Sequence, residues 1–383
     1  MEDLLRIYVL WAPSSSDSER LANLISSHFD GIGMERDGVA FRVPVRFRSQ
    51  AWEIGGKVPR NIALDDAKHN AVVFLHDGFT HEDRNDWDSY IAAIRAGIGR
   101  RGSVDVYIPF GSSAGEPALL SDAQSNTQYA RRDAWRSKLA TQDARDARLL
   151  LHLVFKIREH FRILKGDSTS EPLFVSHAKA DGDDTARLIV DYVNDTGNDV
   201  PLKTFYDAME LSPGDNFQAS FKANIARGTL LAIISDTYDS RPWCIYELTL
   251  AKRARRPVLL ADVGRVRVSR TYPYGANLPK IRVSPDGVQT TWIEQLLVQT
   301  LSEGLRCDIF NAQAQRLLAK YGPSNATVLP RPPELFDVMD RSILGPAIVY
   351  PDPPLGRLES EIVQKALSQV APLTILKTLS EVM

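Results

Sequence analysis

Residues 5–110 alternate between apolar segments of strand length and segments in which apolar residues recur at helical spacing. The strand-like segments are LRIYVLW, FRVPVRF, NAVVFLHD and VDVYIPF, and the helical ones are SERLANLISSHF, PRNIALDDAKH and DWDSYIAAIRAGI. Strands that alternate with helices form a mainly parallel sheet with helices on both faces. The pattern therefore predicts an α/β domain in the first part of the chain.

A polar stretch at 111–128 is expected to be a surface loop, and a long helical segment follows over 130–164. The next segment, GDSTSEP at 166–172, combines Gly, Ser, Thr and Pro as linkers do. We therefore place a domain boundary there.

The alternation of strands and helices restarts after this linker. The expected strands are LFVS, LKTFY, TLLAIIS and PVLLAD, and the expected helices are 183–194, one from Asp215 to Gly228, one starting near Trp243, and 291–303. TLLAIIS is apolar on both faces, as a central parallel strand must be when helices cover both sides of the sheet. A second parallel α/β domain is therefore expected.

The segment after residue 305 has a weaker pattern: a helix over 308–321, a Pro-rich connection, a short strand AIVY and a final helix. This tail suggests no chemistry of its own. It is expected to complete a sheet or to form an interface.

The composition, 44% hydrophobic and 25% charged residues, is that of an ordinary soluble globular protein. The 46 Lys and Arg residues nearly balance the 48 Asp and Glu residues, so no general attraction to nucleic acid or membrane is expected. Cys244 and Cys307 are the two cysteines, too few for a disulfide framework, and they lack metal-ligand spacing. No stretch reaches the roughly 18 apolar residues of a membrane helix. We expect a cytoplasmic protein without a metal site.

Polar and aromatic residues follow the strands of the second predicted domain. Ser176 and His177 end its first strand, Asp207 follows the second, and Trp243 and Glu247 follow the third. In an open parallel sheet, ligands bind in the crevice at the carboxyl ends of the strands. The four-residue spacing of Trp243 and Glu247 places both side chains on one side of a helix. These residues are expected to converge on one site.

Three segments in this order, PLFVSHAKAD, FYDAMELSPGDNF and WCIYE, resemble the three boxes of a TIR (Toll/interleukin-1 receptor) domain, over about residues 171–305. The WCxxE form resembles the TIR domains that consume NAD+ in bacterial immune effectors and axon-degeneration proteins. The resemblance implies a flavodoxin-like, three-layer α/β fold with Glu247 as the catalytic residue. It implies a substrate site formed by Trp243, Ser176, His177, Asp207 and Gly214. Pro213 and Gly214 also predict a turn in the loop that would gate this site or contact a neighbouring subunit.

The expected organisation is therefore two flavodoxin-like domains with parallel sheets in tandem, at 1–165 and 171–305. A mixed helical and strand extension follows at 306–383. Aligning Trp87 with Trp243 places Ile91 where Glu247 stands, so the first domain is either a TIR-like copy without the carboxylate or an unrelated flavodoxin-like domain. In both cases we expect it not to be catalytic, and to serve in sensing or assembly.

Cleavage of NAD+ at the nicotinamide–ribose bond passes through an oxocarbenium-like state, as glycoside hydrolysis does. Nicotinamide leaves as a neutral ring, so a single carboxylate suffices without a general acid. Glu247 would hold the ribose hydroxyls and stabilise the developing positive charge. Trp243 would border the nicotinamide pocket, where an indole face suits a pyridinium cation.

Each residue also has a plainer interpretation. A Glu in the first helical turn usually stabilises the helix dipole at the surface, and a lone His is more often structural than catalytic. Cys244 is expected to be a small buried hydrophobe, and KRARR at 252–256 to be cations at a helix carboxyl terminus. The acidic segment HDGFTHEDRNDWD lacks the spacing of a calcium loop, and no Gly-rich nucleotide-binding motif occurs.

The leading hypothesis is an NAD+ glycohydrolase that releases nicotinamide and ADP-ribose, with NAD+ as substrate and no cofactor. By resemblance it would be an immune or stress effector that is activated by self-association through the TIR domain. Two alternatives remain open: an NAD+ cyclase that makes a cyclic ADP-ribose isomer, and a non-enzymatic scaffold that acts by TIR-to-TIR contact. An upstream sensor or a nucleotide signal is left open as a further partner.

Overall fold

The computed structural model describes residues 3–29, 43–78, 83–113, 128–167, 171–205, 225, 227–266, 275, 277–340, 342 and 344–382. The chain divides into two compact units. The first comprises residues 1–169 and 285–302, and the second comprises 170–284 and 303–383. Each unit contains a five-stranded parallel sheet.

The first unit alternates strands and helices, as the apolar pattern predicts. Its elements are β1 (Asp3–Trp11), α1 (Ser16–Phe29), β2 (Val45–Arg48), β3 (Ala67–His76), α2 (Arg84–Arg100), β4 (Val106–Gly111), β5 (Ala130–Arg131), α4 (Arg132–Arg136) and α5 (Gln142–Leu164). The strands pair in the order β2-β1-β3-β4-β5. Counted along the chain, the first strand lies between the second and the third.

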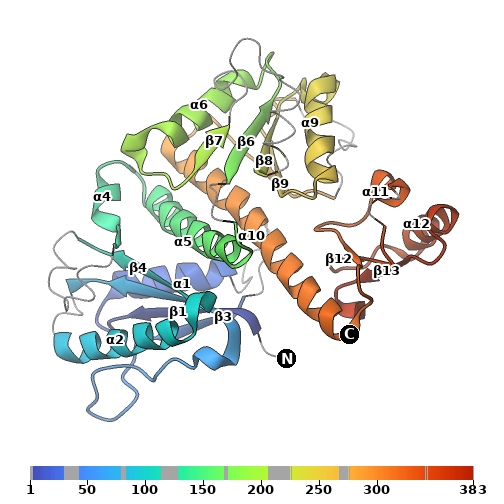
Figure 1. Cartoon of the computed structure of the whole chain (residues 1–383). Coiled ribbons are helices and arrows are strands. Elements are labelled where there is room, and N and C mark those ends of the chain that lie inside the picture. Colours follow the sequence, from blue (N-terminus) through green and yellow to red (C-terminus); the bar gives the residue numbers. More distant parts are fainter. Residues whose placement is uncertain are drawn as a thin grey trace. The chain divides into compact units, whose positions relative to one another are not determined.

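Helices cover both faces of this sheet, with α2 on one side and α1 and α5 on the other (Figure 1). Leu10 of β1 and Phe74 of β3 pack in one cluster with Trp87 and Ile91 of α2. Successive side chains of a strand point to opposite faces, so the equally buried Val9 points to the face away from α2. Cover on both faces explains why residues 71–75 of β3, AVVFL, form a continuous apolar run.

The expectation that PRNIALDDAKH forms a helix was wrong. Only a 3-10 turn at Leu64–Asp66 is helical, and β3 follows it directly. Carbonyl groups in this segment accept side-chain hydrogen bonds: the hydroxyl of Tyr8 donates to the carbonyl of Ala63, and that of Tyr90 to the carbonyl of Arg60, each at 3.0 Å. These contacts hold the segment extended against β1 and α2.

The helical segment expected over 130–164 is divided into β5, α4 and α5. The side chain of Thr141 accepts a hydrogen bond from the backbone N–H of Ala144 at 3.1 Å and so caps the amino terminus of α5. A capping threonine marks a new helix start, which the apolar spacing alone did not show.

The two helices expected at 291–303 and 308–321 are one continuous helix, α10 (Gln289–Tyr321). No proline interrupts this range, so the backbone continues across it. The expected end of the TIR domain near 305 therefore lies inside a helix, whose residues up to 302 belong to the first unit. There Glu294 forms an ion pair with Arg148 of α5, and both side chains are fully buried.

The second unit contains a sheet of the same topology. Its elements are β6 (Pro172–His177), α6 (Asp183–Asn194), β7 (Lys203–Phe205), β8 (Thr229–Ile234), α9 (Pro242–Arg253), β9 (Val258–Asp262) and β10 (Lys280–Arg282). The strands pair in the order β10-β9-β8-β6-β7, so the first strand again lies between the second and the third. Every residue of the central strand β8 is buried. The prediction of two parallel flavodoxin-like sheets is confirmed.

The carboxyl-terminal segment adds a small third sheet to the second unit. It consists of the parallel strands β11 (Thr327–Val328), β12 (Ala347–Tyr350) and β13 (Ile375–Thr378), with α11 (Leu335–Met339) and α12 (Arg357–Val370) between them. The expected mixture of helices and strands after residue 305 is present.

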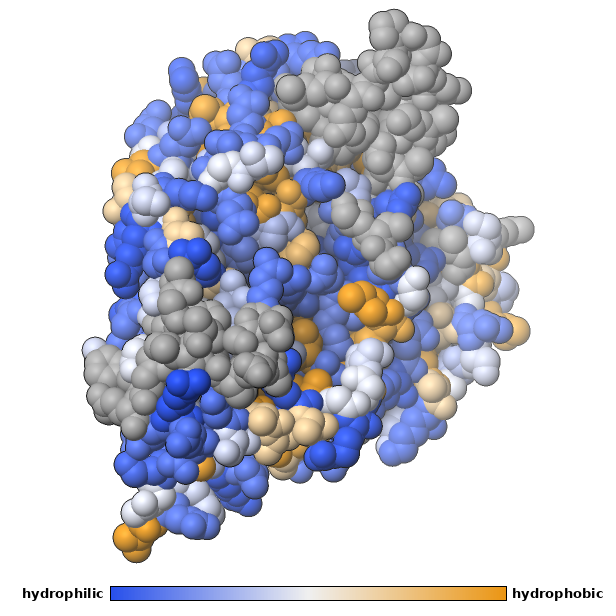
Figure 2. Space-filling model, turned by 60° about the vertical axis from the view of Figure 1, so that its left-hand side comes forward, coloured by the Kyte–Doolittle hydropathy of each residue, from blue (hydrophilic) through white to orange (hydrophobic). Residues whose placement is uncertain are grey.

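On the face seen in Figure 2, hydrophilic residues predominate and hydrophobic ones occur in small groups. Among the residues that the structure describes, no helix is both long and apolar enough to cross a membrane.

Candidate active site

The carboxyl end of β6 and the start of α9, which follows β8 in the chain, border a cavity of about 640 Å³ in the second unit. Trp243 and Glu247 of α9 line it, and His177 lines it from the end of β6. Pro242 occupies the first position of α9, where its missing N–H costs no hydrogen bond, and so defines where this helix starts. The start of α9 places the aromatic ring and the carboxylate one helical turn apart on the cavity wall.

Glu247 is held by a buried chain of hydroxyl groups. The hydroxyl of Ser176 donates to Oε2 of Glu247, and the oxygens of Ser176 and Tyr238 are 2.7 Å apart. A serine hydroxyl has one proton, so Ser176 accepts the hydrogen bond from Tyr238. All three residues are buried: Glu247 is 4% exposed, Ser176 is 1% exposed and Tyr238 is 0% exposed.

The burial of Glu247 excludes the plainer interpretation of this residue as a surface carboxylate that stabilises a helix dipole. Glu247 is the sixth residue of α9 and not part of its first turn. A buried carboxylate is costly unless hydrogen bonds compensate its lost hydration. The Ser176 hydroxyl supplies such compensation while Glu247 still borders the cavity.

His177 has both a structural contact and a place in the cavity wall. Its ring Nε2 lies 3.2 Å from the carboxylate of Asp183, a residue in the first turn of α6. The same carboxylate accepts a hydrogen bond from Arg187. Its backbone carbonyl accepts a hydrogen bond from the thiol of Cys244 at 3.3 Å. The His177 ring is therefore oriented by α6.

Cys244 does not form a nucleophilic pair with histidine, because its thiol contacts the backbone of His177 and not the ring. Burial and the nearby charge of Glu247 raise the pKa of the Cys244 thiol to about 12. At neutral pH this group is a thiol, as expected for a small buried hydrophobe.

The site contains residues that the sequence did not single out. Tyr238 lies in the short 3-10 turn after β8, and Arg241 and Lys179 line the cavity with exposed side chains. Asp181 joins the loops after β6 and β8, since its carboxylate accepts hydrogen bonds from the hydroxyls of Ser235 and Thr237 at 2.6 Å. Burial alone would raise the pKa of Asp181, but the hydrogen bonds have the larger effect, and the pKa is lowered. The position of these residues directly after β6 and β8 was the available signal.

Of the six site residues expected from the sequence, the structure brings together Ser176, His177, Trp243 and Glu247. Asp207 and Gly214 lie outside the described residues, as does the helix expected from Asp215 onward, apart from Ile225 and its carboxyl end at 227–228. Within the described part of the chain, no group of His, Cys, Asp and Glu side chains is arranged to hold a metal ion.

The carboxyl end of α9 is anchored to the carboxyl-terminal segment by a buried charge cluster. Lys252 is 3% exposed and forms an ion pair with Glu334 at 2.5 Å. Arg331 donates to the backbone carbonyl of Lys252 and pairs with the buried carboxylate of Asp337. The KRARR segment thus contributes structural ion pairs, as its position at a helix end indicates. The helix that carries Glu247 is held at both ends.

The first unit has a corresponding helix, α2, after the third strand of a sheet with the same order. Ile91, expected at the place of Glu247, is 1% exposed and packs in the core, and Trp87 is 2% exposed. If α2 and α9 are aligned at their first residues instead of at their tryptophans, Ser89 corresponds to Glu247. Neither alignment places a carboxylate there. The shared strand order is common to flavodoxin-like folds in general.

A parallel sheet whose cavity at the strand ends contains a buried, hydroxyl-held carboxylate is the architecture of a small-molecule site. Residues 173–297 match the model of the TIR domain family. This part of the chain is a TIR domain, and the resemblance of the three sequence segments is confirmed.

Two of the solved structures similar to this chain have low scores. A putative sugar binding protein from Salmonella typhimurium LT2 is 10% identical, with 64% of this chain and 85% of that chain covered and a TM-score of 0.21. A putative phosphosugar isomerase from Silicibacter pomeroyi DSS-3 is 11% identical, with 82% of this chain and 87% of that chain covered and a TM-score of 0.19. Scores this low carry no argument about fold or function. No curated protein sequence matches the chain.

Proposed function

We propose that the TIR domain is an NAD+ glycohydrolase and that Glu247 is its catalytic carboxylate. The observation that supports this most directly is the position of Glu247, buried at the wall of the cavity and held by Ser176. A carboxylate in a low-dielectric wall interacts more strongly with a developing cation than one in water.

The reaction needs little more from the protein than positioning and charge stabilisation. As the bond between nicotinamide and ribose lengthens, positive charge moves from the pyridinium ring to the ribose, and the nicotinamide leaves neutral. Glu247 accepts hydrogen bonds from the ribose hydroxyls and stabilises the oxocarbenium-like state until water attacks it. ADP-ribose, nicotinamide and a proton are the products.

Other residues of the cavity suit other parts of NAD+. Trp243 presents an aromatic ring one turn from Glu247, which fits the cationic nicotinamide of the substrate. Arg241 and Lys179 are exposed at the cavity and would pair with the diphosphate. The indole of Trp243 also contacts Tyr246, with ring centroids 5.2 Å apart, which limits its rotation.

The test is nicotinamide release from NAD+ by the purified full chain, measured at increasing protein concentration, with the products separated by chromatography. Glu247→Gln keeps the shape of the side chain and removes its charge, and we expect it to reduce release by at least about a hundredfold. Glu359→Gln makes the same change at an exposed carboxylate in α12 and should leave release unchanged.

The outcomes separate the possible functions. Equal activity of wild type and Glu247→Gln would refute the proposed role of Glu247. A cyclic ADP-ribose isomer in place of ADP-ribose would identify a cyclase, in which a group of the substrate's own adenosine replaces water. No turnover by the wild type at any concentration would favour the non-enzymatic scaffold.

The setting of this activity is part of the proposal. TIR domains generally associate with one another, and we propose that self-association through residues 171–305 activates the enzyme in the cytoplasm, as an immune or stress effector. A rise in specific activity with protein concentration would support activation by self-association.

A further inference from the structure

The first unit contains a separate cavity of about 150 Å³, where α1, α4 and α5 meet. Four arginines line it, Arg20, Arg132, Arg136 and Arg145, together with the carboxylates of Asp17 and Asp146. The lining therefore carries a formal charge of +2, in a chain whose net charge is -2. This concentration of guanidinium groups is a local feature that the overall composition conceals.

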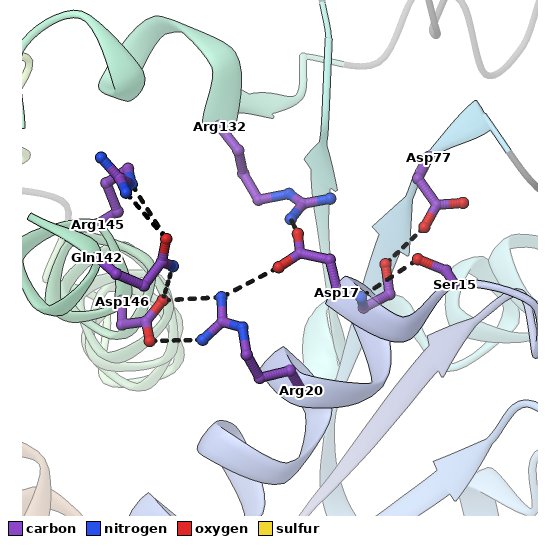
Figure 3. A network of polar contacts seen from close by, with 9 residues as sticks. Ser15, Asp17, Arg20, Asp77, Arg132, Gln142, Arg145 and Asp146 are labelled. Carbon is purple, nitrogen blue, oxygen red and sulfur yellow. Dashed lines mark hydrogen bonds and ion pairs between the residues drawn. The ribbon is translucent and has the colours of Figure 1, made fainter.

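The two aspartates hold two of the arginines in place. Figure 3 shows Arg20 and Arg132 directed toward Asp17, and Arg20 also toward Asp146. Arg20 forms two hydrogen bonds with the carboxylate of Asp146, at 2.6 and 3.0 Å, and Arg132 donates to Asp17 at 2.7 Å. Burial alone would raise the pKa of Asp17, but the nearby charges of Arg132 and Arg20 have the larger effect, and the pKa is lowered. The carboxylate of Asp17 is therefore charged at neutral pH.

The other two arginines have no carboxylate partner among the described residues. Arg145 donates to the side-chain oxygen of Gln142 and to the backbone carbonyl of Leu139 at 2.9 Å, both neutral acceptors. The side chain of Arg136, exposed at the end of α4, forms no hydrogen bond or ion pair with the described part of the chain. The excess positive charge of the cavity therefore resides on Arg136 and Arg145.

Buried donors in the lining are also unsatisfied. The side chain of Arg132 is 10% exposed, and its Nε–H has no acceptor within the described ranges. The indole N–H of Trp135, a residue 2% exposed, has none either. Buried donors without acceptors are rare in folded proteins and costly. Acceptor oxygens supplied by a ligand would satisfy them after small side-chain adjustments.

The cavity lies where open parallel sheets bind ligands. Asp17 and Arg20 belong to the first turns of α1, which follows the carboxyl end of β1, and Arg132 follows β5 directly. The amino terminus of α5, a helix of 23 residues, adds the positive end of its dipole beside Gln142 and Arg145. Location, charge and unsatisfied donors all favour an anion.

We propose that this cavity binds the phosphoryl group of a small phosphorylated molecule. A phosphoryl monoester carries a charge of about −1.5 to −2 at neutral pH and three acceptor oxygens, which match the excess charge of the lining. Arginine forks bind such oxygens in pairs. The volume accommodates a phosphoryl group, while the rest of the ligand extends toward the exposed Arg136. The first unit would thereby be the ligand-sensing part of the chain.

The test measures binding of AMP and of inorganic phosphate to the full chain by equilibrium dialysis at constant ionic strength. Arg136→Gln and Arg145→Gln each remove one guanidinium that has no carboxylate partner in the described part of the chain, and we expect each to weaken binding by at least about tenfold. Arg100→Gln removes an exposed arginine of α2 outside the cavity and should bind as the wild type does. Circular dichroism checks that each variant is folded, and Arg136→Lys, which keeps the charge, should retain part of the affinity.

Tighter binding of AMP than of phosphate would identify a phosphate ester as the ligand class, while the reverse order would support the same site with the free anion. The proposal fails if the wild type shows no saturable binding of either probe up to tens of millimolar. It also fails if Arg136→Gln and Arg145→Gln bind as Arg100→Gln does. Because the readout is binding and not nicotinamide release, its result is independent of the proposed activity of Glu247.

Discussion

The hydroxyl of Ser176, the penultimate residue of β6, donates a hydrogen bond to the carboxylate of Glu247. Glu247 lies on α9, 71 residues later in the sequence. Both residues are buried, and the tyrosine hydroxyl of Tyr238 supports the serine. A strand end and a helix from different parts of the TIR domain thereby determine the orientation of one carboxylate. Ser176 is in this respect a positioning residue for Glu247.

Ser176→Ala should lower nicotinamide release by roughly 10- to 100-fold, because a hydrogen bond to a charged group contributes about 1.5–3 kcal/mol. The loss should appear mainly in kcat, since Ser176 holds Glu247 and does not line the cavity. Tyr238→Phe removes the hydrogen bond one step further away and should have a smaller effect. An unchanged kcat in Ser176→Ala would show that Glu247 does not depend on this contact.

Lys252→Met should destabilise the second unit by about 1–3 kcal/mol, because it removes the closer of the two cations paired with the mostly buried Glu334 and leaves only Arg331, at 3.6 Å. Burial lowers the pKa of Lys252, although Glu334 opposes this shift. The measurement is the free energy of unfolding by denaturant. Arg253→Met is the control, because Arg253 is adjacent but its side chain is 59% exposed. Equal stability of the two variants would contradict a role of Lys252 in anchoring α9.

Glu294→Gln should destabilise the first unit by about 3–5 kcal/mol, because the guanidinium of Arg148, which has no exposed surface, would lose the charge of the Glu294 carboxylate paired with it. Replacing both members, as Arg148→Met with Glu294→Leu, should recover most of this loss, since a buried pair can be exchanged for apolar residues of similar volume. Thermal unfolding of the two variants provides the comparison. A double variant no more stable than Glu294→Gln would contradict this account.

Acid should destabilise the first unit through His28. Burial lowers the pKa of His28 from 6.5 to about 4, so between these two values the unfolded chain binds more protons than the folded one. The contribution of His28 to stability is therefore complete above about pH 6.5 and is lost as the pH falls toward 4, by roughly 3 kcal/mol in total. His28→Gln should flatten the dependence of unfolding free energy on pH in this window. An unchanged slope would show that His28 is not protonated on unfolding.

The sequence by itself determined the α/β class, both parallel sheets and the TIR domain, because a run of apolar residues on both faces and the order of strand ends are local properties of the chain. It also predicted that Ser176, His177, Trp243 and Glu247 lie close together, since residues after successive parallel strands meet at one edge of the sheet. It did not exclude a surface position for Glu247, because burial depends on what other elements cover it.

Only the tertiary structure showed that Ser176 and Tyr238 hold Glu247, that Lys252 is buried against Glu334, and that 289–321 is one helix shared by two compact units. The arginine-lined cavity was equally hidden, since Arg20 and Arg132 are more than a hundred residues apart and converge on Asp17 only after folding. PRNIALDDAKH has a helical spacing of apolar residues, yet hydrogen bonds from Tyr8 and Tyr90 hold it extended. Except for the continuous helix, the deciding interactions are made with residues distant in sequence, which no local pattern contains.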